Sequence, residues 1–267
     1  MSRGWNSILN QANKSLAATI NDPNVSEVPA GADQSPDLIR SMFEQITPTY
    51  DRLNHLFSGQ LDHYWRKRTA AELLRDLNPC GRILDIATGT GDLASALKKN
   101  STTQPRIVGL DFTRSMLDLA CKKYGLQGFN WIEGDGLNLP FASASFDACC
   151  IAFGLRNMID RAAALREMRR ILRPGGRLAI LEFSQPKNPL VRKFYDLYSF
   201  TIMPRLGKWI SGSKAYLYLP SSIRVFWSRK ELLQRMQEAG FTNVRNIDMT
   251  LGVVSLHLGE ANARNSS

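Results

Sequence analysis

The sequence predicts an α/β fold with a seven-stranded, mostly parallel sheet, its last strand antiparallel, and helices on both faces. Two observations predict it. Short apolar segments alternate with helical patterns along the middle of the chain, which is typical of a parallel sheet covered on both faces by its crossover helices. Near the C-terminus, two strand-like segments are joined by only a few residues, and so short a connection permits only antiparallel pairing.

The elements follow in order from this alternation. Parallel strands are expected at the apolar runs 82–87, 106–111, 129–133, 146–152 and 177–183. Helices are expected at 92–99, 113–124, 161–172 and 229–239, where apolar residues recur at helical spacing. The third helix should stop at Pro174-Gly175-Gly176 and the fourth at Gly240. The two last strands are expected at 244–249 and 253–258.

Composition and charge limit the classes of protein. The chain has 267 residues, of which 43% are hydrophobic, and a net charge of +10. These values are typical of one large globular domain. No apolar run approaches the roughly 20 residues that cross a bilayer. The positive charge favours nucleic acid or an anionic membrane surface, and nucleic acid is disfavoured because no zinc-finger spacing, RNP-like aromatic motif or basic tail occurs.

The chain is expected to have three parts. Residues 1–36 form a flexible N-terminal tail and linker, 37–260 the folded domain, and 261–267 a disordered C-terminal tail. A helical substrate or lid insertion is expected at about 188–228 within the domain. Weak amphipathic spacing in the N-terminal tail leaves open a solvated tail, a membrane-surface helix and an organellar targeting peptide.

No metal site is expected. The histidines His55, His63 and His257 show no His-Glu-x-x-His pattern or other ligand spacing. The four cysteines form no Cys-x-x-Cys pair, and two of them are adjacent in an apolar strand. They are expected to be reduced core residues of an intracellular protein.

A strand, an acid and a glycine turn indicate a nucleotide-like ligand. The strand at 82–87 contains Asp85, and Gly89-Thr90-Gly91 follows it and opens a helix. Glycines there let the backbone approach a ligand that lies over the carboxyl ends of a parallel sheet. Asp111 ends the next strand, where a carboxylate can accept ribose hydroxyl protons, and Asp135-Gly136 follows the third strand, near an adenine edge.

Two ligands fit this pattern. Ala94 could take the place of the third glycine of a dinucleotide site, which leaves NAD open. Asp85 and Asp92 would set negative charge beside a pyrophosphate, whereas the sulfonium and ammonium groups of S-adenosylmethionine would be favoured by it. The sequence therefore favours S-adenosylmethionine as cofactor and methyl donor.

On a wider set of motifs the chain resembles the ubiquinone/menaquinone biosynthesis C-methyltransferases, the UbiE/MenG family. The resemblance runs from about 39 to 259, and its most specific motifs are Phe43-Glu-Gln-Ile-Thr-Pro-Thr-Tyr50-Asp51-Arg-Leu-Asn54, Trp65-Arg-Lys, Gly89-Thr-Gly-Asp92 and Phe153-Gly-Leu-Arg156-Asn157. Further matching motifs include Leu181-Glu-Phe-Ser184 and Gly252-Val-Val-Ser-Leu-His257. It implies a Rossmann-like class I methyltransferase fold over 37–260. It also implies methyl transfer from S-adenosylmethionine to a ring carbon of a prenylated quinol, either demethylmenaquinol or a methoxy-benzoquinol ubiquinone precursor.

The resemblance also implies roles for single residues. The methyl donor would lie against Asp85, Gly89, Thr90, Gly91, Asp111, Asp135 and Gly136. The reacting ring would lie near Arg156, Asn157, Tyr50 and Asp51, the last two on an N-terminal lid. Arg156 is a poor base, so it is expected to stabilise a quinolate or to orient a water. Ala152 departs from the family, many of whose members have serine there.

Partners and alternatives follow from the same residues. The aromatic and basic stretch 194–227 could line a prenyl groove, lie on a membrane surface or pack as core. A cytoplasmic protein at the inner face of the membrane is expected, with a homodimer or a quinone-biosynthesis complex as further partners and no nucleic acid. The other functions considered are a NAD-binding oxidoreductase, a non-catalytic scaffold and a methyltransferase for another phenolic or sterol-like acceptor.

Overall fold

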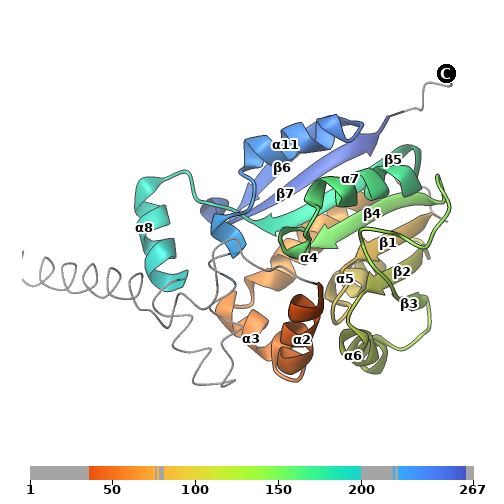
Figure 1. Cartoon of the computed structure of the whole chain (residues 1–267), viewed down its shortest axis with the longest axis horizontal. Helices are drawn as coiled ribbons and strands as arrows, with labels where there is room; N and C mark the ends of the chain where they lie inside the picture. The colour runs from red at the N-terminus through yellow and green to blue at the C-terminus, as the bar shows by residue number, and fades with distance from the viewer. Residues whose placement is uncertain (1–35, 76, 78–80, 200–218, 220–221, 263–267) are drawn as a thin grey trace, which may run out of the picture.

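The computed structural model describes residues 36–75, 77, 81–199, 219 and 222–262. These residues build one seven-stranded sheet in the order β3-β2-β1-β4-β5-β7-β6, with helices on both faces (Figure 1). The strands are β1 (Arg82–Ile86), β2 (Arg106–Asp111), β3 (Phe129–Glu133), β4 (Phe146–Ala152), β5 (Leu172–Phe183), β6 (Phe241–Met249) and β7 (Val254–Ala261).

The pairing confirms the predicted topology. β1 pairs parallel with β2 and β4, β2 with β3, and β4 with β5. Only β7 runs against its neighbours, pairing antiparallel with both β5 and β6. The short 3-10 turn η3 (Thr250–Gly252) joins β6 to β7. So short a connection permits only antiparallel pairing of the two strands.

Helices cover both faces because each strand sends alternate side chains to opposite sides. In Figure 1, α7 (Arg161–Ile171) and α11 (Arg229–Glu238) lie in front of the sheet, and α4 (Leu61–Leu74) and α5 (Asp92–Asn100) lie behind it. One core cluster joins α7 and α11 to the sheet, and the other joins α4 and α5. The adjacent Cys149 and Cys150 are both fully buried, one in each cluster.

The start of β5 differs from the prediction. The strand begins at Leu172, directly after α7, and runs through the Pro-Gly-Gly segment that was expected to be only a helix stop. Phe146 pairs with Leu172 and Ala148 with Arg177, so the extra residues of β5 form a bulge, where Gly175 takes a φ of +75°. β6 likewise starts three residues early, at Phe241, and β7 extends to Ala261, into the segment that was expected to be a tail.

The crossover helix α6 (Arg114–Tyr124) joins β2 to β3 and packs against both strands. Further helices are α2 (Pro36–Ile46), α3 (Tyr50–Phe57) and α8 (Pro189–Leu197). Of the expected insertion at 188–228, α8 is described, whereas 200–218 and the N-terminal tail 1–35 lie outside the described residues. Within the described part, no helix is both long and apolar enough to cross a membrane.

Candidate functional site

Two cavities meet at the carboxyl ends of the parallel strands. One, of about 510 Å³, contains Asp111, Glu133 and Asp135 and is here called the acidic cavity. The other, of about 380 Å³, is lined by many aromatic side chains and also by the charged Asp62, Arg66, Asp85, Asp92 and Arg156, and is here called the aromatic cavity. Both volumes are adequate for a small organic ligand. Residues that line both cavities form a shared wall: Phe43, Tyr50, Ala87, Gly89, Ala152 and Phe153.

The shared wall contains unusual backbone. Ala87 directly follows β1 with a φ of +51°, and Phe153 directly follows β4 with a φ of +56°. Residues other than glycine seldom adopt this left-handed conformation, and where it occurs it clusters at functional sites. Gly154 permits the two turns to approach, because a Cβ there would lie 2.7 Å from the Cβ of Ala87. The wall between the cavities is thus held by strained, closely packed turns that the sequence did not predict.

The acidic cavity contains four of the residues expected at the cofactor, Gly89, Asp111, Asp135 and Gly136, whereas Asp85 and Thr90 line the aromatic cavity and Gly91 lines neither. Asp111 is 7% exposed, and its two oxygens accept the N–H of Gly89 at 2.8 Å and of Thr113 at 2.9 Å. Burial raises the pKa of Asp111, and these backbone donors act in the opposite direction. Each carboxylate oxygen has a second lone pair, so Asp111 can hold the glycine turn and still accept hydroxyl protons from a ligand.

At the far end of the acidic cavity, Asp135 accepts the N–H of Leu137 at 2.8 Å. Gly136 lies beside it, and a Cβ at this position would come within 2.6 Å of Met158 Cε. A larger residue there would therefore push Met158, which also lines the cavity, out of place. Asp111, Asp135 and Gly136 come from the ends of different strands, as the sequence predicted, and the sheet brings them to one cavity.

Asp85 lies beneath the glycine turn. It is 1% exposed and accepts the hydroxyl of Thr88 at 2.6 Å and the N–H of Ala94 at 3.1 Å. Burial raises the pKa of Asp85 to about 7. The carboxyl therefore carries only part of a charge near neutral pH, and its contacts hold the turn to the start of α5. This weakens the expectation that Asp85 provides full negative charge beside the ligand.

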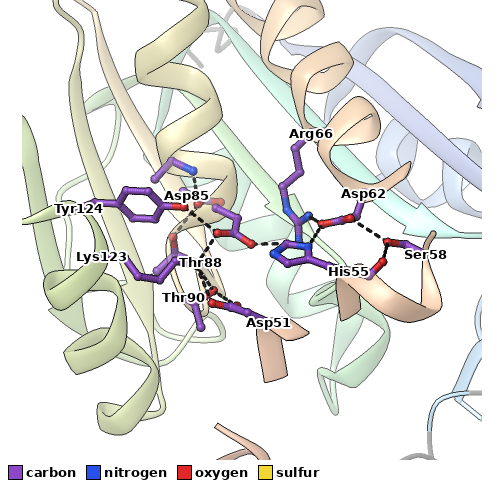
Figure 2. A network of polar contacts seen from close by, with 12 residues as sticks. Asp51, His55, Ser58, Asp62, Arg66, Asp85, Thr88, Thr90, Lys123 and Tyr124 are labelled. Carbon is purple, nitrogen blue, oxygen red and sulfur yellow. Dashed lines mark hydrogen bonds and ion pairs between the residues drawn. The ribbon is translucent and has the colours of Figure 1, made fainter. Parts of the chain in front are cut away.

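A group here called the polar latch fastens α3 to the glycine turn (Figure 2). Asp51 accepts the hydroxyl of Thr90 at 2.6 Å, and the ammonium of Lys123 lies 2.7 Å from both Asp51 and Asp92. Burial alone would raise the pKa of Asp92, but Arg66 and Lys123 lower it below its usual value. Asp51 lines neither cavity, so the structure places this carboxylate in the latch and not beside the cavity contents.

The latch continues into a cluster on α3 and α4. Asp62 accepts from Ser58 at 2.7 Å and contacts His55 at 2.8 Å, and Arg66 donates to the same carboxylate. His63 stacks on His55 with ring centroids 4.5 Å apart. His55, Asp62 and His63 thus form a group with metal-ligand chemistry that the sequence did not predict, because the two histidines lie on different helices. The Arg66 guanidinium on Asp62 opposes a second cation there.

Arg156 lies in the aromatic cavity and is held from behind. Its side chain donates to Glu182 at 3.2 Å and to the carbonyl of Phe153, and it is only 7% exposed. Glu182 is fully buried on β5. The sequence did not single out Glu182, although an acid within an otherwise apolar strand is a signal that it has a polar partner.

Two tyrosine hydroxyls share this cavity with Arg156. Burial raises the pKa of Tyr50, while the charges of Arg156 and Arg66 lower it. Burial raises the pKa of Tyr195, on α8, to about 12, against the smaller lowering effects of Ser199 and Arg156. Both phenols are therefore protonated donors near neutral pH. Tyr195 belongs to the aromatic stretch expected from the sequence, whereas Trp209, Tyr216 and Tyr218 of that stretch lie outside the described residues.

Arg156 and Asn157 were expected to act together, but the structure separates them. Arg156 lines the aromatic cavity, and Asn157 lines the acidic cavity. The 3-10 turn η1 (Leu155–Asn157) sends the two neighbours to opposite sides of the shared wall. Tyr50 lines both cavities.

Comparison with known sequences identifies the family. The sequence model of the ubiE/COQ5 methyltransferase family matches residues 31–261. The ubiquinone/menaquinone biosynthesis C-methyltransferase UbiE of Syntrophotalea carbinolica is 44% identical over 224 residues, which are 82% of this chain and 92% of that protein. The demethylmenaquinone methyltransferase of Deinococcus radiodurans is 43% identical over 225 residues, 83% of this chain and 92% of that protein.

Solved structures share the fold at low sequence identity. A SAM-dependent methyltransferase from Thermotoga maritima superposes with a TM-score of 0.57 at 22% identity, over 83% of this chain and 99% of that one. The [4+2]-cyclase SpnF superposes with a TM-score of 0.60 at 16% identity, over 84% of this chain and 95% of that one. This fold therefore accommodates more than one reaction, and the sequence match is what settles the family. The chain belongs to the ubiE/COQ5 methyltransferase family.

Proposed function

We propose that this protein transfers the methyl group of S-adenosylmethionine to a ring carbon of a prenylated quinol in respiratory quinone biosynthesis. The observation that carries the proposal is the pair of cavities that meet at one wall, with Asp111 and Asp135 in one and Arg156 among aromatic rings in the other. The printed functions of the relatives at 43–44% identity support the same reaction.

The acidic cavity fits the nucleoside part of the donor. Asp111 accepts the ribose hydroxyls with the lone pairs that the glycine turn leaves free, and Asp135 lies where the adenine edge is read. Gly89, Thr90 and Gly91 bring the backbone close to the amino acid part of the donor. Bound there, S-adenosylmethionine supplies an electrophilic methyl group on a positively charged sulfur.

The aromatic cavity fits the acceptor ring. Arg156 stays protonated, so it stabilises the oxygen of the quinol as its hydroxyl proton leaves. The hydroxyl proton would pass to water, the ring carbon would bond to the methyl group as the sulfur–methyl bond breaks, and water would accept the ring proton as aromaticity returns. The oxygen would then regain a proton, so that one proton is released in all. The phenols of Tyr50 and Tyr195 donate hydrogen bonds in the same cavity, and the aromatic walls exclude water from the electrophile.

The outer face of α8 is proposed to contact an anionic membrane surface, where a prenylated acceptor is dissolved. Leu190, Phe194 and Leu197 follow helical spacing and are 64%, 61% and 36% exposed. Arg192 and Lys193 flank them and are exposed. Tyr195, on the same helix, and Tyr198, directly after it, line the aromatic cavity, so α8 would connect that cavity to the lipid. On this proposal the protein acts peripherally on the inner, cytoplasmic face of the membrane.

Vesicle binding tests the membrane contact. Leu190→Ser combined with Leu197→Ser should reduce sedimentation with anionic vesicles, whereas Leu126→Ser with Leu251→Ser, at residues 68% and 76% exposed elsewhere, should not. Binding should also weaken as salt is raised. If the wild-type protein sediments equally with neutral and anionic vesicles at every salt concentration, an anionic surface is not the partner.

The function itself is tested by offering labelled S-adenosylmethionine with chemically reduced demethylmenaquinol or a demethylated benzoquinol precursor. Methylated product is expected with at least one reduced quinol and not with the same compound in its oxidised form, because the oxidised ring has no hydroxyl to ionise. If a different phenol is methylated and neither quinol is, the acceptor assignment is wrong. A preference for NAD over S-adenosylmethionine in binding would overturn the donor assignment.

A further inference from the structure

Glu182 accepts hydrogen bonds from both the main chain and the side chain of Arg156. One carboxylate oxygen accepts the backbone N–H of Arg156 at 3.2 Å and its Nη1 at 3.3 Å. The other accepts the same Nη1 at 3.2 Å and the N–H of Phe183 at 3.1 Å. Glu182 lines neither cavity, whereas Arg156 and Phe183 both line the aromatic cavity. The carboxylate thus stands directly behind the cavity wall.

Stability alone is a poor explanation for this pair. A fully buried ion pair loses the solvation of both charges, and replacing such a pair by apolar residues is often neutral or stabilising. Burial also raises the pKa of Glu182, and the charge of Arg156 offsets only part of this rise. What the pair provides instead is a fixed place for a guanidinium in an apolar cavity.

Within the described part of the chain, the side-chain hydrogen bonds that hold Arg156 all come from one nitrogen of its guanidinium, Nη1. Glu182 and the carbonyl of Phe153 both accept from Nη1. Nε is buried and has no hydrogen-bond partner among the described residues. Because a buried donor without a partner is unfavourable, a hydrogen bond from Nε to an acceptor oxygen of a ligand would be favoured.

We propose that Glu182 is a positioning residue: it holds Arg156 in the wall of the aromatic cavity and partly neutralises its charge, thereby setting the pH at which the acceptor hydroxyl ionises. This rests on the proposed function, because the acceptor is taken to be a quinol. Other ionisable groups also face this region, and they set the background against which Glu182 acts: Tyr50 on α3, Asp62 and Arg66 on α4, Asp85 on β1, Asp92 on α5, Asp111 on β2, Tyr195 and Asp196 on α8, and Tyr198 directly after α8.

Two substitutions separate the effect of the negative charge of Glu182 from the effect of its hydrogen bonds to Arg156. Glu182→Gln keeps a hydrogen-bond acceptor for Arg156 but removes the negative charge, so Arg156 should ionise the acceptor more easily. The acid limb of the kcat–pH profile should move to lower pH by about one unit, with KM for S-adenosylmethionine unchanged within about twofold. Glu182→Ala removes both the negative charge and the hydrogen-bond acceptors. The kcat of this variant should fall by about tenfold or more below that of Glu182→Gln at every pH.

A second readout does not depend on turnover. The side-chain N–H of Arg156 Nε is followed by NMR hydrogen exchange in ¹⁵N-arginine-labelled protein, with its signal assigned from Arg156→Lys. Exchange should become about tenfold faster or more in Glu182→Ala, because the guanidinium is released, and should stay near the wild-type rate in Glu182→Gln.

Glu72→Gln is the matched control. Glu72 is also a buried glutamate, 1% exposed, and it pairs with Arg68 at 2.8 Å and Arg75 at 3.0 Å, but it lines neither cavity. This control should lose stability without moving the pH profile or the exchange of Arg156.

Superimposable pH profiles of wild type and Glu182→Gln, with unchanged Arg156 exchange in Glu182→Ala, would show that Glu182 is only structural. If the alanine variant does not fold, the pH profile of the glutamine variant decides. If the wild type methylates neither quinol, the proposed function fails, and the exchange experiment still decides whether Glu182 holds Arg156.

Discussion

The acidic cavity and the aromatic cavity are built in different ways. The acidic cavity is made by the carboxyl ends of adjacent parallel strands, so its residues Asp111 and Asp135 are placed by sheet topology. The aromatic cavity gathers residues from α2, α3, α4, β1, α5, β4, β5 and α8, which come together only in the folded chain. The first kind of site is fixed by local order along the sequence. The second depends on how distant helices pack, and this is where specificity for an acceptor can vary within a family.

The comparison assigns donor binding to one cavity and turnover to the other, and Arg156→Ala tests the second assignment. Removing the cation that stabilises a developing oxyanion should lower kcat by about a hundredfold to a thousandfold. The affinity for S-adenosylmethionine, measured by calorimetry, should stay within about twofold, because Arg156 lines only the aromatic cavity. Arg166→Ala, at a side chain that is 64% exposed, is the control. A large loss of affinity for S-adenosylmethionine in Arg156→Ala would show that Arg156 also acts in donor binding, and would contradict the assignment of donor binding and turnover to separate cavities.

The free energy of unfolding should depend on pH because of Asp85, which lies beneath the glycine turn shared by both cavities. Its pKa is about 7 in the folded protein and about 3.8 in the unfolded chain, so the folded state binds the extra proton. The contribution is therefore full below pH 3.8 and is lost as the pH rises through 7, by roughly 4 kcal/mol in all.

Asp85→Asn should remove this dependence. The difference in free energy of unfolding between wild type and Asp85→Asn, from denaturant melts at several pH values, should shift against the wild type as the pH rises towards 8. A difference that does not change with pH would mean that Asp85 is charged in the folded protein.

Asp111→Asn tests the acidic cavity. The amide keeps one acceptor oxygen but places an NH₂ group where the other oxygen receives backbone or ligand protons. Affinity for S-adenosylmethionine should fall by roughly tenfold to a hundredfold, as expected for lost hydrogen bonds to a charged group. Asp118→Asn, at an exposed carboxylate on α6, should bind as the wild type does. Equal affinity in Asp111→Asn would contradict the ribose assignment.

The smallest effect is expected at the polar latch. Lys123→Met leaves the carboxylates of Asp51 and Asp92 without their shared ammonium, so α3 should open more readily over the glycine turn. KM for S-adenosylmethionine should rise by about fivefold, and the wild-type KM should itself rise with salt. The neighbouring exposed Lys122, replaced in the same way, is the control. Identical KM values for the two variants would show that the latch does not act on donor binding.

The sequence predicted the sheet and the acidic cavity because both depend on periodicity and on residues at strand ends. Gly89, Asp111, Asp135 and Gly136 need only the parallel order of β1, β2 and β3 to reach one cavity. The boundaries of β5 were wrong because a Pro-Gly-Gly segment was interpreted only as a breaker, while a bulge with Gly175 at positive φ lets the strand continue.

The aromatic cavity could be predicted only in part, because its contacts join residues far apart in the chain. Glu182 reaches Arg156 across 26 positions, and Lys123 reaches Asp51 across 72. The strained backbone at Ala87 and Phe153 was also beyond reach, since neither residue type signals a positive φ. Neighbours in sequence were expected to share a role, but η1 turns Arg156 and Asn157 into different cavities.

The most direct test of the account is where the transferred methyl group is found. Enzyme is given S-adenosylmethionine carrying a deuterated methyl group together with reduced demethylmenaquinol, and the product is examined by mass spectrometry and NMR. The account predicts a deuterated methyl group on a ring carbon, lost when Arg156 is replaced by alanine. A deuterated methyl group on a quinol oxygen, or none on the quinol while the donor is bound, would contradict it.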